Sequence, residues 1–322
     1  MSSPNLTEIV TTTLRNRSKE LADNITNSNA ILSRLSEKGN VRPASGGRSI
    51  VEELEYAENG TFQFYSGYEV LNVSPSDVFT AAEYDWKQAA VNVSWSGLET
   101  RIQNAGAEAV INLLEKRIKN AMKTFSNQLS ISLYSDGTGY GGKEIDGLLQ
   151  QVAKDPTSGT VGGINRANWE FWRNQTSGDV ANIDTSSALL DAEMRAMWLE
   201  CRRGMDKPDL ILADQNLYDS FWSGLQDIQR VSENDTAVKG FNSLKFVTAD
   251  VVYDGDTIAA AGQSNVMFFL NTDYIHYRPH SGTNMTPLPE KNPLNQDAGV
   301  VPCVWAGNLT CSNASLQGIV YT

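Results

Sequence analysis

Histidine and cysteine are scarce in this sequence, and their scarcity limits the chemistry that the chain can carry. The two histidines, His276 and His280, have a proline between them in a strand-like stretch, so they do not share a helical face as HExxH metal ligands do. The three cysteines form no CxxC pair, and an odd, scattered set favours reduced thiols over a disulfide framework. No GxSxG motif is present, and no cysteine and histidine are arranged as in a papain-like site. We therefore expect no catalytic residues, no metal site and no cofactor.

Basic residues are outnumbered by acidic ones, 26 against 38, which gives a net charge of -12. A protein that coats nucleic acid needs a basic face to displace the counterions of the phosphates, so this class is excluded. A protein that encloses DNA without gripping it remains possible.

Long hydrophobic runs are also missing. No apolar run approaches the roughly 18 residues of a membrane span, so we expect no membrane partner. Residues 1–8 lack the basic and then apolar pattern of a signal peptide, so we expect the chain to stay in the cytoplasm where it is made. The 322 residues give room for two or three lobes with hydrophobic cores of their own.

Residues 1–40 place apolar side chains at roughly the spacing of one helical face. Residues 42–47, rich in proline and glycine, follow at once and read as a flexible link. The helical face needs a partner, which can be another subunit or the same chain. We interpret this region as an N-terminal arm.

Residues 48–73 contain a hairpin signal, because Asn59 and Gly60 separate two stretches rich in tyrosine, phenylalanine and valine. A two-stranded hairpin is marginal in water unless it lies against another surface. It can pack on its own domain, but we favour an extended loop that buries its aromatic residues on a neighbour. The acidic run from Glu52 to Glu58 can be a general acid pair or a cation site, and we favour a solvated or interface-facing charge run.

Residues 89–95 alternate apolar and polar side chains and predict a half-buried strand. Residues 98–133 then keep helical spacing almost without interruption, and about 30 helical residues span roughly 45 Å. The glycine-rich residues 137–142 stop this helix. They are not a phosphate-binding loop, because Lys143 is followed by Glu144 and no strand leads in.

The second half alternates helices with short strands and predicts a mixed α+β lobe. We expect a helix that is capped by Asp184 or Thr185 and ended by Gly204, and a second helix that begins at Asn216. Strands are predicted at residues 210–213, 244–248, 251–253 and 266–270. The Asp-Gly-Asp triplet at residues 254–256 lacks the rest of a calcium-binding loop, so we interpret it as a turn.

The order of these parts resembles that of tailed-phage major capsid proteins with the Hong Kong ninety-seven phage-type fold. The likeness covers most of the chain and begins with an arm, a loop, a strand and a long helix. It is carried by EELEYAENGTFQFYSGYEVL at residues 52–71, LYSDGTG at 133–139, GGINRANWEFWRNQ at 162–175, KPDLILADQNLYDSF at 207–221, and FNSLKF, VVYDG and MFFLNTDYI at 241–246, 251–255 and 267–275.

The resemblance implies a thin subunit whose arm and extended loop reach over neighbouring subunits. The implied divisions are an N-terminal arm at 1–45, an extended loop at 46–75, a peripheral domain at 76–161 with a spine helix at about 98–133, an axial domain at 162–265, return strands of the peripheral domain at 266–300, and a C-terminal segment in the axial domain at 301–322. The expected contact residues are Ile50, Glu52, Glu53, Leu54, Tyr56, Phe62, Phe64, Tyr65 and Tyr68 in the loop, and Leu6, Ile9, Leu14, Leu21 and Ile25 in the arm.

The resemblance also implies a function, a major capsid protein that self-assembles into hexamers and pentamers of an icosahedral phage head around double-stranded DNA. Its partners are then copies of itself, a portal, and a scaffold or cement protein, and it is assembled in the bacterial host cytoplasm and located in the virion capsid. Some members of the family link an extended-loop lysine to a neighbour's asparagine. This chain has no lysine between Ser45 and Trp86, so we expect a shell without covalent links.

Two other readings of the sequence stay open. One is an encapsulin-like nanocompartment shell, which has the same fold and encloses enzymes in place of DNA. The other is a hydrolase that combines the acidic loop with the His276 region. It requires an ordered pocket that joins the two.

Overall fold

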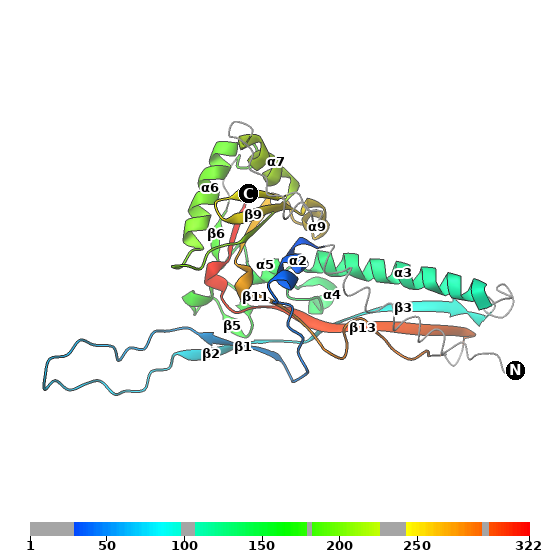
Figure 1. Ribbon diagram of the computed structural model, residues 1–322, viewed down its shortest axis with the longest axis horizontal. Coiled ribbons are helices and arrows are strands. Elements are labelled where there is room, and N and C mark those ends of the chain that lie inside the picture. Colours follow the sequence, from blue (N-terminus) through cyan, green and yellow to red (C-terminus); the bar gives the residue numbers. More distant parts are fainter. Residues whose placement is uncertain (1–28, 98–106, 179–181, 226–242, 292–295) are drawn as a thin grey trace.

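The computed structural model describes five stretches of the chain. These are residues 29–97, 107–178, 182–225, 243–291 and 296–322, and the side chains of 107–116 and of Ser243 are not described. The subunit is elongated: one lobe is built on a sheet, a long flat platform runs beside it, and a thin loop projects from the end of the platform opposite the long helix (Figure 1).

The lobe contains a mixed six-stranded sheet with the strand order β6-β14-β10-β7-β9-β8. The strands are β6 (Gln175–Ser177), β14 (Gly318–Tyr321), β10 (Val266–Leu270), β7 (Leu210–Ala213), β9 (Ala249–Tyr253) and β8 (Ser243–Phe246). Every residue of β7 and β10 is buried, because both faces of the central strands are covered. Along β7, Leu210 and Leu212 join the core on one face, whereas Ile211 and Ala213 join the core on the other.

Helices α6 (Ser187–Glu200) and α7 (Gln215–Gly224) cover one face of this sheet and share its second core. The predicted cap of α6 is wrong by one to two residues, since Ser186 occupies the N-cap position. Asp214 caps α7 by accepting a hydrogen bond from the Leu217 amide at 3.1 Å. The Asp-Gly-Asp triplet is not a simple turn, because α9 (Gly255–Ala260) begins within it.

The platform consists of three antiparallel pairings on the long strand β13 (Ala298–Cys311). Strand β3 (Lys87–Ser96) runs along one edge, from Ala298 opposite Ser96 to Gly307 opposite Lys87. Strands β11 (Ile275–Pro279) and β12 (Thr286–Pro287) pair with the other edge. The strand predicted at 89–95 is therefore confirmed.

The long helix α3 (Ala107–Ser132) lies along β3 (Figure 1). At about 1.5 Å per residue, its 26 residues span about 39 Å. Its described inner face is apolar and places Ile118, Met122, Phe125 and Leu129 in the core. The helix predicted at 98–133 is confirmed over this range, and residues 98–106 lie outside the described residues.

Short elements connect the lobe to the platform. They are α4 (Gly139–Gly142), α5 (Leu148–Gln151), β4 (Thr160–Val161), β5 (Ile164–Asn165) and the single 3-10 turns η2 (Glu170–Trp172), η3 (Thr272–Tyr274) and η4 (Ala314–Leu316). In α4 the backbone turns left-handed at Tyr140, with φ 54°, and at Gly141 and Gly142. Side chains disfavour this conformation, so the two glycines make the turn possible and Tyr140 is strained.

Part of the predicted arm belongs to the body of the subunit. Helix α2 (Ala30–Glu37) buries Ile31, Leu32 and Leu35 in the core of its own chain. Its Arg34 pairs with Asp250 in β9, and backbone bridges then join the following segment to β11. The arm boundary at residue 45 is therefore wrong, because residues 29–45 pack on this subunit. The arm contact residues Leu6, Ile9, Leu14, Leu21 and Ile25 lie outside the described residues.

The hairpin at the base of the loop differs from the predicted one. Strand β1 (Ile50–Glu55) pairs antiparallel with β2 (Phe79–Tyr84), from Ile50 opposite Tyr84 to Glu55 opposite Phe79. Asn59 and Gly60 therefore do not form a tight turn between the paired strands but lie within the long connection from β1 to β2. Residues 56–78, called the loop below, form no strand, and they project beyond the 46–75 boundary that the sequence suggested. Among the described residues no surface covers the aromatic stretch, so it gains little from pairing.

Candidate inter-subunit contact surface

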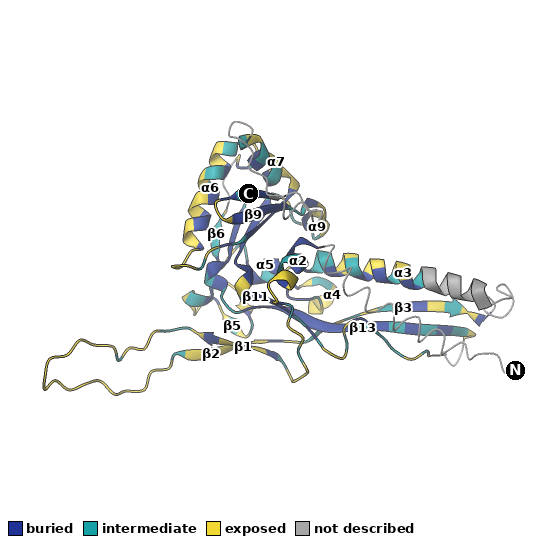
Figure 2. Cartoon of the chain, in the orientation of Figure 1, coloured by how far each residue is buried: buried dark blue, intermediate teal, exposed yellow. Residues whose placement is uncertain are grey.

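The loop is exposed along most of its length and lies away from the buried parts of the subunit (Figure 2). It carries a set of large, exposed apolar side chains. Phe64 is 90% exposed and Tyr68 is fully exposed. The exposed apolar residues of the loop are Phe62, Phe64, Tyr65, Tyr68, Val70, Leu71 and Val73. Soluble monomers rarely keep so many large apolar groups together in water, and such patches mark interaction sites. The four aromatic contact residues predicted here are therefore accessible.

A turn closes the end of the loop. The Glu69 amide donates to the Ser66 carbonyl at 3.3 Å, and a Glu69 carboxylate oxygen accepts from the Ser66 amide at 3.1 Å. Gly67 has φ 55°, a value that glycine adopts without strain. We call residues 64–69 the loop tip.

The base of the loop is fixed in the subunit core. Ile50 and Leu54 pack in a cluster with Tyr84 and Trp172, and both are at most 5% exposed. Their prediction as contacts to a neighbour is wrong, because the inward face of β1 is used within the chain. Glu53 lies on the exposed face of the same strand, where its predicted role remains a prediction.

Glu52 is also turned inward, which corrects the prediction that it faces solvent or a neighbour. The Arg278 guanidinium donates two hydrogen bonds to its carboxylate, at 2.7 and 2.8 Å, and the Thr310 hydroxyl donates a third at 2.8 Å. Burial acts to raise the pKa of Glu52, but the hydrogen bonds from Arg278 and Thr310 and the charge of Arg278 together lower it. The carboxylate is therefore held ionised as a structural anchor between β1 and the platform.

His276 lies near this anchor, so the structure does bring part of the acidic run close to a histidine. Burial lowers the pKa of His276, the Glu52 carboxylate opposes this, and the charges of Arg42 and Arg278 lower it further. Its carboxylate accepts three hydrogen bonds from Arg278 and Thr310, so Glu52 is not available as a free base. Neither of the two cavities described below is lined by Glu52 or His276.

Tyr56, the first residue of the loop, is half-buried. Its ring packs on Trp169 and Phe171, with centroids 5.7 and 5.5 Å away. These rings line a groove of about 550 Å³ at the foot of the loop, called the loop-base groove. Its other lining residues are Asp77, Phe79, Thr80, Ala81, Gly163, Ile164 and Asn165. Tyr56 is thus committed largely to its own subunit.

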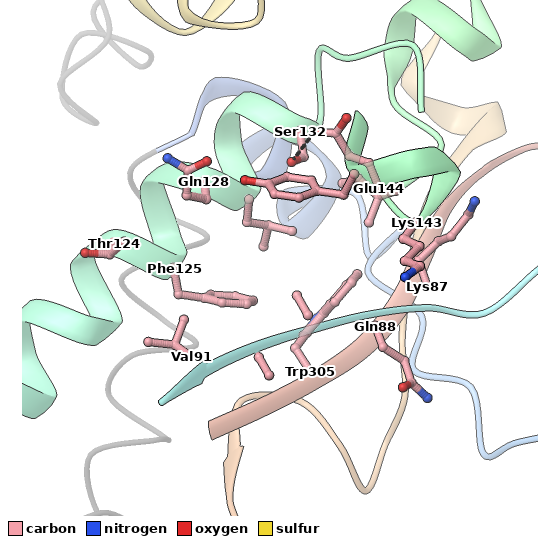
Figure 3. A pocket seen from close by; sticks show the side chains of 15 residues that line it. Lys87, Gln88, Val91, Thr124, Phe125, Gln128, Ser132, Lys143, Glu144 and Trp305 are labelled. Carbon is pink, nitrogen blue, oxygen red and sulfur yellow. Dashed lines mark hydrogen bonds between the residues drawn. The ribbon is translucent and has the colours of Figure 1, made fainter. Parts of the chain in front are cut away.

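A second cavity, of about 450 Å³, lies between α3 and β3 (Figure 3). We call it the spine cavity. Its lining residues are Lys87, Gln88, Ala89, Ala90, Val91, Thr124, Phe125, Gln128, Leu129, Ser132, Tyr140, Lys143, Glu144, Ile145 and Trp305. Phe125, Leu129 and Trp305 are buried and form its apolar wall. No sequence pattern indicates this cavity, because its lining comes from four separate segments.

Charged groups stand at one side of the spine cavity. Lys87 donates to the Gly142 carbonyl at 2.8 Å and lies 3.5 Å from Asp146. Glu144 accepts a hydrogen bond from Ser132 at 2.7 Å, as the dashed line in Figure 3 marks. Lys143 is exposed.

The described residues offer few groups for other chemistry. They contain no cluster of three histidine, cysteine or acidic side chains that could hold a metal ion. All three cysteines are buried and unbridged, and burial raises the pKa of the Cys311 thiol to about 12. None of the described helices is both long and apolar enough to cross a membrane.

Comparison with solved structures assigns the fold. The chain superposes on a subunit from the cyanophage A-1(L) capsid asymmetric unit with a TM-score of 0.63 and 14% identity, over 88% of this chain and 90% of the other. It superposes on a subunit of the capsid of Myoviridae phage XM1 with a TM-score of 0.56 and 10% identity, over 89% and 91%. The chain has the Hong Kong ninety-seven phage-type capsid fold. The α+β class and the capsid fold expected from the sequence are confirmed.

The capsid fold is not limited to phage shells. The holo-SrpI encapsulin complex from Synechococcus elongatus matches with a TM-score of 0.55 and 8% identity, over 91% of this chain and 88% of the other. Neither the protein-family models nor the curated proteins gave a match to the sequence.

Proposed function

We propose that this chain is the structural subunit of an icosahedral phage head, in which its copies assemble into hexamers and pentamers around double-stranded DNA. One observation carries the proposal: within a capsid fold, a thin loop holds its aromatic side chains away from every core of its own subunit. A neighbouring copy supplies the surface that this loop lacks.

The energetics of the loop favour association. A buried aromatic side chain removes about 150–250 Å² from water, and at about 25 cal/mol per Å² this is roughly 4–6 kcal/mol before the cost of ordering. Each loop carries several such aromatic side chains, and every copy in a capsomer repeats the contact. Their burial therefore provides a large driving force for assembly. The ion pair of Glu52 with Arg278 fixes the base of the loop, which lowers the part of the ordering cost that comes from motion of the whole loop.

The charge of the chain fits an enclosing role. With a net charge of -12, the subunit holds no general attraction for phosphates, so packed DNA would not adhere to the shell. A portal and a scaffold or cement protein would complete the particle, which would be assembled in the host cytoplasm and would become the virion capsid. Loop contacts and arm contacts, without covalent links, would hold the shell.

A structural role accounts for the ionisable groups near the loop. Glu52 is held by Arg278 and Thr310, and it lines neither of the two described cavities. We propose that the chain is not an enzyme. Turnover of an ester, phosphate or peptide substrate by the purified chain would contradict this.

Negative-stain microscopy of the purified full chain tests the proposal. Closed shells, rings or sheets are expected, whereas monodisperse small particles under all conditions would overturn it. Particles purified from the native source and treated with nuclease then separate the two shell types. Protected double-stranded DNA supports a phage head, whereas protein cargo without DNA supports a nanocompartment.

A further inference from the structure

The spine cavity is larger than the voids of an ordinary subunit core. Protein interiors are packed so closely that voids larger than a water molecule are few. A cavity of about 450 Å³ falls instead in the range of about 300–1,000 Å³ that is typical of small-molecule sites. It is also accessible from outside, because Thr124, Gln128 and Lys143 of its lining are exposed. A ligand can therefore enter it from solvent.

Apolar and charged groups lie at different places in the lining of the cavity. Figure 3 shows Phe125 and Val91 on one side, Trp305 between, and Lys87 with Lys143 on the opposite side. Phe125 and Trp305 are buried, so the apolar side belongs to the core of the subunit. A ligand that fills this space needs an apolar body with a charged group at one end.

The charge at the polar end of the cavity is positive. The charged lining residues are Lys87, Lys143 and Glu144, so two lysines against one glutamate leave one positive charge in a chain whose net charge is -12. Lys87 is already engaged by the Gly142 carbonyl at 2.8 Å and by Asp146 at 3.5 Å. Lys143 is exposed, so it is the cation that a ligand can reach. The matching ligand group is an anion.

The rim of the cavity contains a strained residue. Tyr140 belongs to the lining, its φ is 54°, and its side chain is 79% exposed. Strained backbone conformations cluster at ligand sites, where the surrounding structure holds them in place. An apolar ligand in the cavity gives this exposed aromatic ring a surface on which to pack. The rim therefore supports the same conclusion as the charge and the size.

The volume of the cavity limits the ligand to one short chain. At roughly 30 Å³ for each water-sized group, about 450 Å³ holds about 15 heavy atoms. The two acyl chains of a phospholipid exceed this volume, whereas the roughly 12 heavy atoms of decanoate fit within it. An aromatic side chain of a protein partner fills the apolar side but brings no anion to Lys143. A single-chain carboxylate matches both ends.

We propose that the spine cavity binds a medium-chain fatty acid, whose alkyl chain packs on Phe125, Leu129 and Trp305 and whose carboxylate pairs with Lys143. The ligand then connects α3 with the platform and stabilises the folded subunit by binding to it. This inference does not depend on the proposed shell function, because the whole lining belongs to one subunit.

Isothermal titration calorimetry of the purified full chain tests the proposal, with decanoate kept below its micelle concentration. One decanoate should bind per chain. Octanoate, which is two methylenes shorter, should bind about 15-fold more weakly, because each buried methylene changes affinity about fourfold. Decyltrimethylammonium carries the same alkyl chain with the opposite charge and should bind at least about tenfold more weakly than decanoate.

Substitutions then locate the site. Ala89→Phe fills the cavity from β3 and should abolish decanoate binding, and Lys143→Gln should weaken it about tenfold. Lys123→Gln, on α3 but outside the lining, is the matched control for the charge and should leave the affinity unchanged. Phe64→Ala is the control for the exposed aromatic residues of the loop, and this variant should also bind decanoate as the wild type does.

Four results would overturn the inference. They are an absence of decanoate binding, equal binding of decyltrimethylammonium, equal effects of Lys143→Gln and Lys123→Gln, and a loss of binding in Phe64→Ala. The first means that the cavity holds solvent or a protein side chain, and the last means that the loop binds the alkyl chain. If Ala89→Phe does not fold, the two lysine variants decide the question, because both positions are exposed. None of these results bears on shell assembly, which microscopy measures separately.

Discussion

Glu52 and Arg278 form a two-point ion pair that ties the loop hairpin to the platform. The Arg278 Nε and Nη2 atoms lie 2.7 and 2.8 Å from the two carboxylate oxygens, and the Glu52 side chain is 8% exposed. A buried, two-point pair fixes direction as well as position. The loop therefore leaves the subunit at a set angle, although its own residues form no sheet.

Removal of one partner of this pair should destabilise the subunit. Glu52→Ala leaves Arg278 without its carboxylate, and breaking a buried pair costs about 3–5 kcal/mol. Because the Arg278 side chain remains 19% exposed and can regain water, we expect a loss of about 2–3 kcal/mol in the free energy of unfolding. Urea denaturation of unassembled subunits measures it.

Glu53→Ala is the matched control for this prediction. Glu53 follows Glu52 on β1 but faces solvent, so its removal should change the free energy of unfolding by no more than about 0.5 kcal/mol. Equal losses from the two substitutions would contradict a specific role of the ion pair.

His276 should make the stability of the subunit fall in mild acid. Its pKa is lowered by burial, with Arg42 and Arg278 adding to the effect and Glu52 opposing it. The unfolded chain, with a histidine pKa of about 6.5, then binds the proton more readily than the folded chain does. The stabilising contribution is present above that value and is lost as the pH falls through the lowered folded pKa.

The comparison of pH 7.5 with pH 5 measures this contribution. The free energy of unfolding should fall less in His276→Gln than in the wild type, whereas His280→Gln, whose residue packs on Trp86, serves as the control. Glu52 does not contribute to this change. Because its pKa is lowered, its stabilising contribution persists at pH 5 and is lost only in stronger acid. Equal pH dependence in the wild type and His276→Gln would contradict the assignment.

The sequence predicted those elements whose signal is local. The spacing of apolar residues along α3 and the continuous apolar run of β10 reflect only their own helix or strand. The bounds of β10 and the C-terminal end of α3 were predicted to within one residue. The sequence also indicated that the aromatic residues of the loop need a surface outside the loop, because so many large rings occur there without regular spacing.

Pairings between distant residues could not be predicted in this way. Arg278 lies 226 residues from Glu52, and nothing near Glu52 distinguishes it from the exposed Glu53 until the register of β1 is known. The true partner of β1 is likewise β2, beyond the loop, because β2 carries Ala82 and Tyr84 into the core shared with Ile50. The spine cavity arises from the packing of four segments and has no sequence pattern.

Aromatic residues at the loop tip should control assembly without affecting the stability of the subunit. Phe64 and Tyr68 touch little of their own chain, so Phe64→Ala and Tyr68→Ala should change the free energy of unfolding by less than about 0.5 kcal/mol. Each should abolish or greatly reduce assembly, because a large apolar contact is removed at every copy. Light scattering and microscopy measure this effect.

Gln63→Ala is the control for the loop substitutions, since Gln63 lies beside Phe64 but contributes only an exposed hydrogen bond to the Val70 carbonyl at 3.3 Å. Assembly of this variant should resemble that of the wild type. A similar loss of shells from Gln63→Ala would mean that any change in the loop disrupts assembly, and the aromatic rings would have no special role.

Assembled particles should separate into single chains when heated in denaturant and detergent. An isopeptide bond from the loop requires a lysine amine, and residues 49–86 contain neither lysine nor arginine. The shell must then be held by burial of apolar side chains and by ion pairs, both of which denaturant disrupts. Electrophoresis under reducing conditions should show one band at the mass of the single chain. Ladders of linked subunits that persist after heating would contradict this and would direct attention to lysines outside the loop, such as Lys143 at the spine cavity.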